Sequence, residues 1–184
     1  RRQNIVSGKD GNNFCPGDNL KREELTKIIV EAFNLTGTEN ALSFEDAVEG
    51  AWYEDYIRIA SSNGIINGIS ETSFGVGENI TRQDLCVMVY RALNVSEESD
   101  VMAFSDSQEV AEYAKDAVYS LKAEGIISGM GENTFAPMQN ATRARTLPSF
   151  FFLVVSPWFS RKLTPRTPMV MMAMATQVRA EISS

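Results

Sequence analysis

The stretch Gly64-Ile65-Ile66-Asn67-Gly68 recurs as Gly125-Ile126-Ile127-Ser128-Gly129, 61 positions further along the chain. The similarity continues downstream, where four residues recur at the same offset: Phe74, Asn79, Thr81 and Arg82 return as Phe135, Asn140, Thr142 and Arg143. The series also extends backward by 60 positions, to Gly8, Phe14 and Arg22. Because a regular repeat constrains architecture more strongly than any single element does, the sequence predicts three successive copies of one structural unit.

Each copy is predicted to contain a helix, a tight loop, a short extended piece and a second helix. In the second copy Asp46 is a suitable N-cap, and Gly64 ends the first helix after an apolar stripe at helical spacing: Trp52, Tyr56, Ile59 and Ala60. The second helix starts at Thr81, which has capping-box spacing to Asp84. It continues as the stripe Leu85, Met88, Val89, Ala92 and Leu93, which the first copy repeats as Leu25, Ile28, Ile29, Ala32 and Phe33. Helices that each carry one apolar stripe must pack on one another, so the predicted fold class is all-α.

These spacings divide the chain into three repeats and a tail. We expect a partial first repeat at 1–40, a second repeat at 41–100, a truncated third repeat at 101–145 and an aberrant tail at 146–184. The chain opens with Arg1 inside the first copy, which suggests a cut from a longer chain. In the tail, Leu147-Pro148-Ser149 interrupts the expected last helix, and the net charge changes from negative to positive. A frameshift in the source gene and a genuine Met-rich disordered end are both open interpretations.

Composition restricts the possible partners of the 184-residue chain. Its formal net charge of −7 and pI near 4.7 argue against a nucleic-acid partner, because such binding depends on Lys and Arg neutralising phosphates. Apolar runs such as 150–155 are too short for a membrane-spanning helix, so no membrane insertion is expected.

Composition also argues against catalysis. The sequence has no His, which removes imidazole-based mechanisms and most zinc sites. Cys15 and Cys86 are too few for a disulfide framework and are expected to be unpaired. The segment 10–13 resembles a calcium loop only in part, because the alternating acids and the terminal Glu of an EF-hand are missing. No catalytic residue, cofactor or metal is therefore predicted, and the chain is expected not to be an enzyme.

The recurring motifs resemble the S-layer homology domain family. That family's pattern is a Phe-x-Asp start, an aromatic-rich first helix, a Gly-Ile-x-x-Gly loop, then Phe-x-Pro and Thr-Arg-Ala-Glu. The second repeat carries it as Phe44-Glu45-Asp46, Gly64 to Gly68, Phe74-Gly75-Val76 and Thr81-Arg82-Gln83-Asp84. The third carries it as Phe104-Ser105-Asp106, Gly125 to Gly129, Phe135-Ala136-Pro137 and Thr142-Arg143-Ala144. Departures from this pattern are Lys21 for Thr, Val76 for Pro, the Gln83-Asp84 pair and, above all, Arg145 at the position of the acidic residue.

The resemblance implies a fold and a function. It implies helix-loop-helix repeats around a central helical bundle with pseudo-threefold symmetry, which is incomplete here. It also implies a secreted, cell-surface module of a Gram-positive-type bacterium that binds secondary cell-wall polysaccharide non-covalently, with a pyruvylated glycan as the suspected ligand. Other surface-layer proteins are possible partners.

Five charged residues are candidates for ligand binding. Arg22, Arg82 and Arg143 lie at helix starts, where a planar guanidinium and free backbone N–H groups can hold a carboxylate. The alternative for each arginine is a salt bridge to a neighbouring acid. Asp46 and Asp106 can accept hydrogen bonds from sugar hydroxyls, or they serve only as N-caps.

Four further candidates are uncharged. Trp52 and Tyr113 can stack on a sugar ring, although aromatic residues at helical spacing usually belong to a core. Gly68 and Gly129 allow a ligand to approach the backbone closely, or they serve only turn geometry.

Two other classes of function stay open at this point. The grooves between repeats can receive another surface protein, which makes the chain a protein–protein assembly module. Alternatively, the chain is a fragment of a secreted polysaccharide hydrolase. Binding and turnover assays on wall material separate these alternatives from glycan anchoring.

Overall fold

The computed structural model describes residues 15–37, 44–94, 104–144 and 146. These residues form four α-helices and two short 3₁₀ helices: α1 (Arg22–Ala32), α2 (Glu54–Ser62), α3 (Arg82–Leu93), η1 (Ser107–Glu109), η2 (Glu112–Ala114) and α4 (Lys115–Ala123). Within the described ranges the extended segments form only isolated β-bridges and no sheet. The predicted all-α fold class is confirmed.

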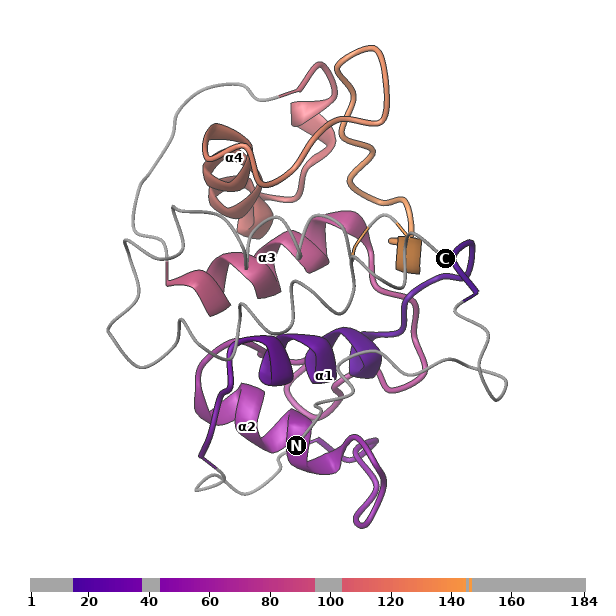
Figure 1. The fold of residues 1–184 in the computed structure, drawn as a ribbon, viewed down its shortest axis with the longest axis vertical. Helices are drawn as coiled ribbons and strands as arrows, with labels where there is room; N and C mark the ends of the chain where they lie inside the picture. Colours follow the sequence, from indigo (N-terminus) through magenta and orange to yellow (C-terminus); the bar gives the residue numbers. More distant parts are fainter. Residues whose placement is uncertain (1–14, 38–43, 95–103, 145, 147–184) are drawn as a thin grey trace, which may run out of the picture.

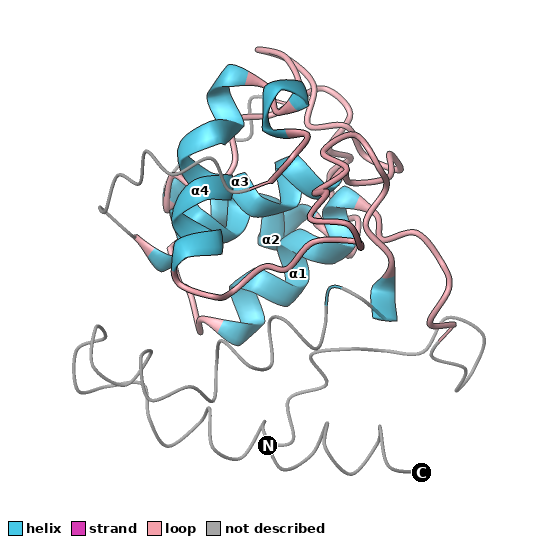
Figure 2. Cartoon of the chain, turned by 90° about the horizontal axis from the view of Figure 1, so that it is seen from above, coloured by secondary structure: helices cyan, strands magenta, loops and turns pink. Residues whose placement is uncertain are grey.

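The helices stack in the order α2, α1, α3, α4 (Figure 1). Helix α3 lies at the centre, because it packs on α1 on one side and on α4 and η2 on the other. The loops that connect the helices gather at one side of this stack (Figure 2). None of the helices in the described part of the chain has the length and apolar character needed to cross a bilayer.

The second helix of each unit begins where the sequence predicts. The backbone N–H of Asp84 donates to Thr81 Oγ1 at 3.2 Å, and this hydroxyl donates to the Asp84 carboxylate at 2.8 Å. At the start of α1, the backbone N–H of Lys21 donates to Glu24 at 3.0 Å. Helical backbone also begins at residue 143. The predicted interruption at 147–149 lies outside the described residues.

The first helix of each unit begins later than predicted, and Asp46 is not its N-cap. Helix α2 starts at Glu54 after Tyr53, so turns occupy the intervening residues. Asp106 directly precedes η1, but its side chain makes no capping hydrogen bond to that helix. The physical reason is that both carboxylates bind backbone N–H groups of a loop roughly thirty residues downstream.

The core is continuous across the helices. All five residues of the stripe predicted for the first repeat are buried, four of them in α1 and the fifth at its C-cap: Leu25, Ile28, Ile29, Ala32 and Phe33. In α2 the core residues are Ile57 and Ala60, whereas the predicted Trp52 is 55% exposed. In α3, Cys86 and Val87 are buried in addition to the predicted Met88 and Val89, because this helix is covered on two sides.

Three equivalent segments close into a ring around a pseudo-threefold axis. The segments are 19–21, 79–81 and 140–142, and the middle residue of each donates its backbone N–H to the backbone oxygen of the middle residue in another repeat. Leu20 donates to Ala141 at 2.8 Å, Ile80 donates to Leu20 at 2.9 Å and Ala141 donates to Ile80 at 2.9 Å. The isolated bridges follow the same cycle, pairing residue 21 with 79, 81 with 140, and 142 with 19. The first repeat is therefore a neighbour of both other repeats, although it is more than a hundred residues from the third in sequence.

Candidate ligand-binding site

Two of the predicted arginines join one repeat to the next. Arg22 donates from Nε to the carbonyl oxygen of Phe74 at 2.9 Å, and its guanidinium lies 5.2 Å from the centre of the Phe74 ring. Arg82 makes the same pair of contacts to Phe135, at 2.8 Å and 4.9 Å. Each arginine therefore holds the loop of the following repeat through a hydrogen bond and a cation–π contact.

The three arginines differ in exposure. Arg22 is 7% exposed and Arg143 is 4% exposed, and Arg143 forms an ion pair with Glu24 at 3.2 Å. Burial lowers the pKa of Arg22. The negative charge of Asp84 acts in the opposite direction but does not cancel this shift. Arg82 is only half-buried and donates from Nη2 to the carbonyl oxygen of Ser128 at 3.2 Å. Of the three, Arg82 has the guanidinium that a ligand can approach most readily.

Asp46 organises the loop that Arg22 holds. Its carboxylate accepts backbone N–H bonds from Phe74 and Gly75 at 2.7 Å and from Val76 at 2.9 Å, and a hydroxyl bond from Ser73 at 3.1 Å. Burial raises the pKa of Asp46, but these hydrogen bonds to the ionised carboxylate outweigh it and lower the pKa below its ordinary value. The carboxylate is therefore a fixed part of the loop.

Asp106 plays the same part in the third repeat. It accepts backbone N–H bonds from Phe135 and Ala136, both at 2.7 Å. These bonds lower the pKa of Asp106 despite the opposing effect of burial. An acid, a loop and an arginine of the preceding repeat thus form a connected unit at the junction of the first and second repeats and at the junction of the second and third.

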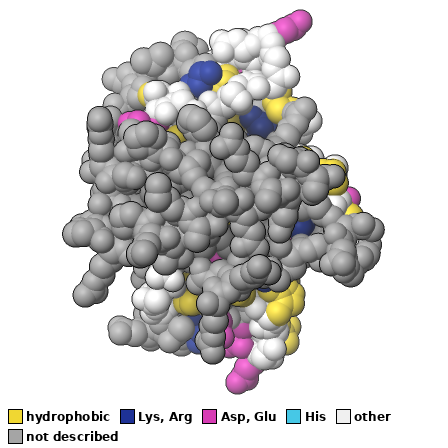
Figure 3. All heavy atoms as spheres, in the orientation of Figure 1, with side chains coloured by type: hydrophobic (Ala, Val, Ile, Leu, Met, Phe, Trp, Pro, Cys, Tyr) yellow, Lys and Arg dark blue, Asp and Glu magenta, His cyan; other side chains and the backbone are white. Residues whose placement is uncertain are grey.

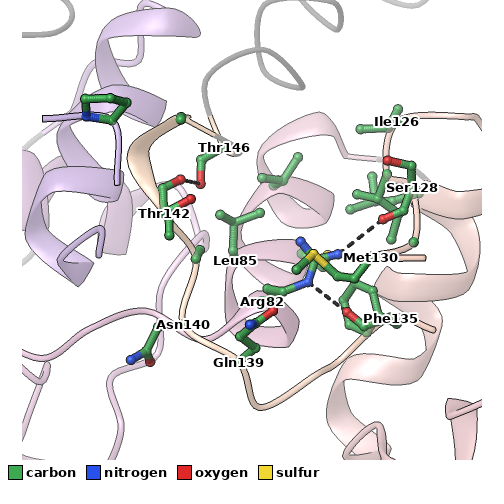
Figure 4. Close-up of a pocket in the computed structure, with 18 of the residues that line it drawn as sticks. Arg82, Leu85, Ile126, Ser128, Met130, Phe135, Gln139, Asn140, Thr142 and Thr146 are labelled. Carbon is green, nitrogen blue, oxygen red and sulfur yellow. Dashed lines mark hydrogen bonds between the residues drawn. The ribbon is translucent and has the colours of Figure 1, made fainter. Parts of the chain in front are cut away.

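A cavity of about 760 Å³ lies between the second and third repeats, and Pro16 and Gly17 of the first repeat complete its lining. The lining includes Arg82, Leu85 and Cys86 of α3 and the loop 126–130 of the third repeat. Figure 4 shows the Arg82 guanidinium between Ser128 and Phe135, with Gln139 nearby. Amide, hydroxyl and guanidinium groups therefore share this cavity with apolar side chains.

Only two of the predicted ligand-binding residues, Arg82 and Gly129, line this cavity. The lining residues Met130, Gln139 and Asn140 were not among the predicted ligand-binding residues. The one sequence feature that pointed to any of them is the recurrence of Asn79 as Asn140, because it marks a position common to two repeats.

Both predicted aromatic residues are exposed. Trp52 is 55% and Tyr113 is 60% exposed, so the alternative that they belong to the core is wrong. Trp52 makes an edge contact with Tyr53, with ring centres 5.5 Å apart. The Tyr113 hydroxyl donates to Asp84 at 2.7 Å and accepts from Gln83 at 3.1 Å. Burial and the hydrogen bond to Asp84 raise the pKa of Tyr113 to about 12.

Comparison with known proteins identifies the repeats. The family model described as S-layer homology domain matches residues 43–86 and 103–144. The chain belongs to the S-layer homology domain family. This membership indicates a protein of the cell surface.

The relatives of this S-layer homology chain are much longer proteins. It is 30% identical over 129 residues to the surface-layer 125 kDa protein of Lysinibacillus sphaericus, covering 70% of the chain and 11% of that protein. It is 29% identical over 147 residues to an amylopullulanase of Thermoanaerobacterium thermosulfurigenes, covering 77% of the chain and 8% of the enzyme. It is 23% identical over 151 residues to the cellulosome-anchoring protein of Acetivibrio thermocellus, covering 78% of the chain and 34% of that protein. The chain therefore spans about a tenth of the first two relatives.

Packing explains the two glycines of the S-layer homology loops. A Cβ atom at Gly68 would lie 2.6 Å from Phe44 and from two backbone oxygens, and the residue has a φ of +74°. A Cβ atom at Gly129 would lie 2.8 Å from the carbonyl oxygen of Thr134. Both positions therefore require glycine for the loop itself, whether or not a ligand approaches.

On the face shown in Figure 3, acidic, basic and hydrophobic side chains are interspersed among the described residues. No group of three or more His, Cys, Asp and Glu in the described part of the chain is arranged to hold a metal ion.

Proposed function

We propose that this chain is a non-covalent cell-surface anchor that binds secondary cell-wall polysaccharide and carries no catalytic function of its own. The observation that supports this most is the cavity between the second and third repeats, where Arg82 lies beside polar and apolar groups. Its volume of about 760 Å³ is within the usual range of small-ligand sites. The proposal includes the predicted division of the chain into a partial first repeat at 1–40, a second repeat at 41–100, a truncated third repeat at 101–145 and a tail at 146–184.

The ligand that fits this chemistry is a sugar carrying a carboxylate, such as a pyruvylated unit of the wall glycan. A planar guanidinium binds carboxylates with directional, charge-assisted hydrogen bonds. Its bonds to Ser128 and Phe135 hold Arg82 in place before a ligand arrives, so little side-chain entropy is lost on binding. Gln139 and Asn140 supply amides for sugar hydroxyls, and Leu85 and Met130 supply apolar surface for the faces of the ring.

Co-sedimentation with purified wall sacculi tests the proposal. The protein should sediment with sacculi that retain secondary polymer, and it should do so equally after protease treatment of the sacculi. It should stay in the supernatant when the polymer has been removed with hydrofluoric acid. Binding that survives removal of the polymer would overturn the proposal, and binding that protease abolishes would favour a protein-assembly module instead.

Matched arginine variants locate the binding to the cavity. Arg82→Lys keeps the charge but loses the planar fork, so wall binding should weaken. Arg58→Lys is the control, because Arg58 pairs with Glu54 on the surface of α2 at 2.7 Å and does not line the cavity. Incubation of the protein with the released polymer should yield no reducing ends, and their appearance would favour the hydrolase alternative.

A further inference from the structure

We propose that Trp52 and Lys27 form a second subsite, outside the Arg82 cavity, that selects the acidic sugar units of the glycan. The inference rests on the proposed function, which it deepens by assigning a ligand class to the junction between the first and second repeats. Neither residue lines the cavity between the second and third repeats.

The two side chains meet where α1 passes the segment before α2. The Lys27 ammonium lies 5.9 Å from the centre of the Trp52 ring and 5.7 Å from the centre of the Tyr56 ring. Trp52 nevertheless keeps 55% of its surface exposed, so the indole and the ammonium are presented together. Lys27 itself is half-buried and therefore held in position.

Lys27 has no ion-pair partner among the described residues. The nearby carboxylate of Glu31 instead accepts a hydrogen bond from the Tyr56 hydroxyl at 2.8 Å. The contacts of the Lys27 ammonium are the two aromatic rings, which attract a cation without neutralising its charge. The ammonium is therefore available to an external anion.

An acidic sugar satisfies both groups at once. The apolar face of a sugar ring can lie on exposed indole, while a carboxylate on that ring reaches the ammonium. A neutral sugar gains only the indole contact, and a free anion gains only the ammonium. The carboxylate can come from a pyruvate ketal or from a uronic acid, because the site recognises the carboxylate and the sugar ring that both kinds of sugar have.

The equivalent place in the third repeat has the opposite electrostatic character. Tyr113 replaces Trp52, and its hydroxyl donates to the carboxylate of Asp84 at 2.7 Å. The position equivalent to Lys27 is Val87, which is buried. A carboxylate at Tyr113 would meet another carboxylate, so the Tyr113 platform does not select acidic units as the Trp52 platform does.

The fluorescence of Trp52 reports directly on this subsite. The sequence holds two tryptophans, so Trp158→Phe leaves Trp52 as the sole indole. This protein is titrated with three probes: a methyl hexoside bearing a pyruvate ketal, the same hexoside without the ketal, and a methyl glucuronide. We expect both acidic probes to change the Trp52 emission at concentrations about tenfold lower than the neutral probe, because only they add a charged hydrogen bond.

Lys27→Gln in the same background should abolish the preference and bring the acidic probes to the affinity of the neutral one. Lys122→Gln is the matched control, because its ammonium also lies over an aromatic ring, Phe104 at 4.7 Å, but that ring is buried. The preference should also decline between low salt and 0.5 M NaCl, since screening weakens exposed pairs. Far-UV circular dichroism verifies that each variant is folded.

The outcomes separate this inference from the proposed function. An acidic preference that persists in Lys27→Gln, or emission that no probe changes, overturns the subsite. If sacculus binding remains sensitive to Arg82→Lys in that case, the proposed function stands. Conversely, a Lys27-dependent acidic preference with no binding to sacculi supports the subsite and overturns wall anchoring.

Discussion

Arg82 of α3 holds the third repeat by donating from Nε to the carbonyl oxygen of Phe135, with its guanidinium over the Phe135 ring. Arg22 of α1 holds Phe74 of the second repeat in the same way. The arginine at the helix start therefore contributes to stability at the junction of the first and second repeats and at the junction of the second and third. At Arg82 it also lines a cavity, so stability and ligand affinity depend on the same side chain.

Substitutions at Arg22 and Arg82 should separate the effect on stability from the effect on ligand affinity. Arg22→Lys and Arg82→Lys each lose the Nε donor to a carbonyl, so each should lower the free energy of unfolding by about 1–2 kcal/mol. Only Arg82→Lys should weaken binding of a pyruvylated wall fragment, by about 1 kcal/mol or more. Isothermal titration and thermal melts of both variants provide the measurements. Equal loss of affinity in the two variants would contradict the assignment of the cavity as the binding site.

Asp46 should make stability sensitive to acid. Its pKa in the folded protein is below the ordinary value of 3.8, so the stabilisation is complete above that value and is lost as the pH falls through the folded pKa. Asp46→Asn should lower the free energy of unfolding at pH 7 by about 2 kcal/mol, because an amide cannot accept all four bonds. Its denaturant midpoint should depend less on pH below pH 4 than that of the unmodified chain.

Asp55→Asn serves as the control for this measurement. Asp55 is an exposed residue in the first turn of α2, and the change should cost only a few tenths of a kcal/mol. If the two variants lost acid sensitivity to the same extent, the hydrogen bonds at the loop would not be its source.

Gly68 should tolerate alanine far less well than Gly77. Both have positive φ, +74° and +80°, but a Cβ atom meets Phe44 and backbone oxygens only at Gly68. Gly77→Ala should therefore cost about 1 kcal/mol for the backbone alone. Gly68→Ala should cost about 2–4 kcal/mol, because steric overlap adds to the same strain. Urea unfolding of the two variants tests this, and equal midpoints would show that the loop accommodates a side chain.

The two cysteines should differ in reactivity. Cys86 is buried, and its burial raises the thiol pKa to about 12, so almost no reactive thiolate exists at pH 8. Cys15 is half-buried. A disulfide reagent at pH 8 should label one thiol per folded molecule quickly and the second only in denaturant. Cys15→Ser should remove the fast phase, and a fast phase that remains would place Cys86 within reach of solvent.

Local features of the fold were predictable from the sequence. The Thr81 cap and the apolar stripe of α1 follow from residues three or four apart, whose relationship is fixed by helix geometry. The late start of α2 was not predictable in this way. Asp46 is a good N-cap by residue type, but its carboxylate is engaged by Phe74 and Gly75.

The site was predictable only in part. Arg82 stood out because it recurs at each helix start, and the structure brings it to a cavity. Lys27 did not stand out, because the equivalent position in the second repeat is Val87 and the motif does not mark it. Its relation to Trp52 arises from the packing of α1 beside α2, which spacing along one helix does not reveal.

The ring of hydrogen bonds through Leu20, Ile80 and Ala141 distinguishes this module from an open solenoid. In a linear array the terminal repeats have one neighbour each, so they fray first and unfolding can proceed inward from either end. Here each repeat touches two others, and loss of any one repeat removes two of the three interfaces. Unfolding should therefore be cooperative across the repeats, with no intermediate in which two repeats remain docked.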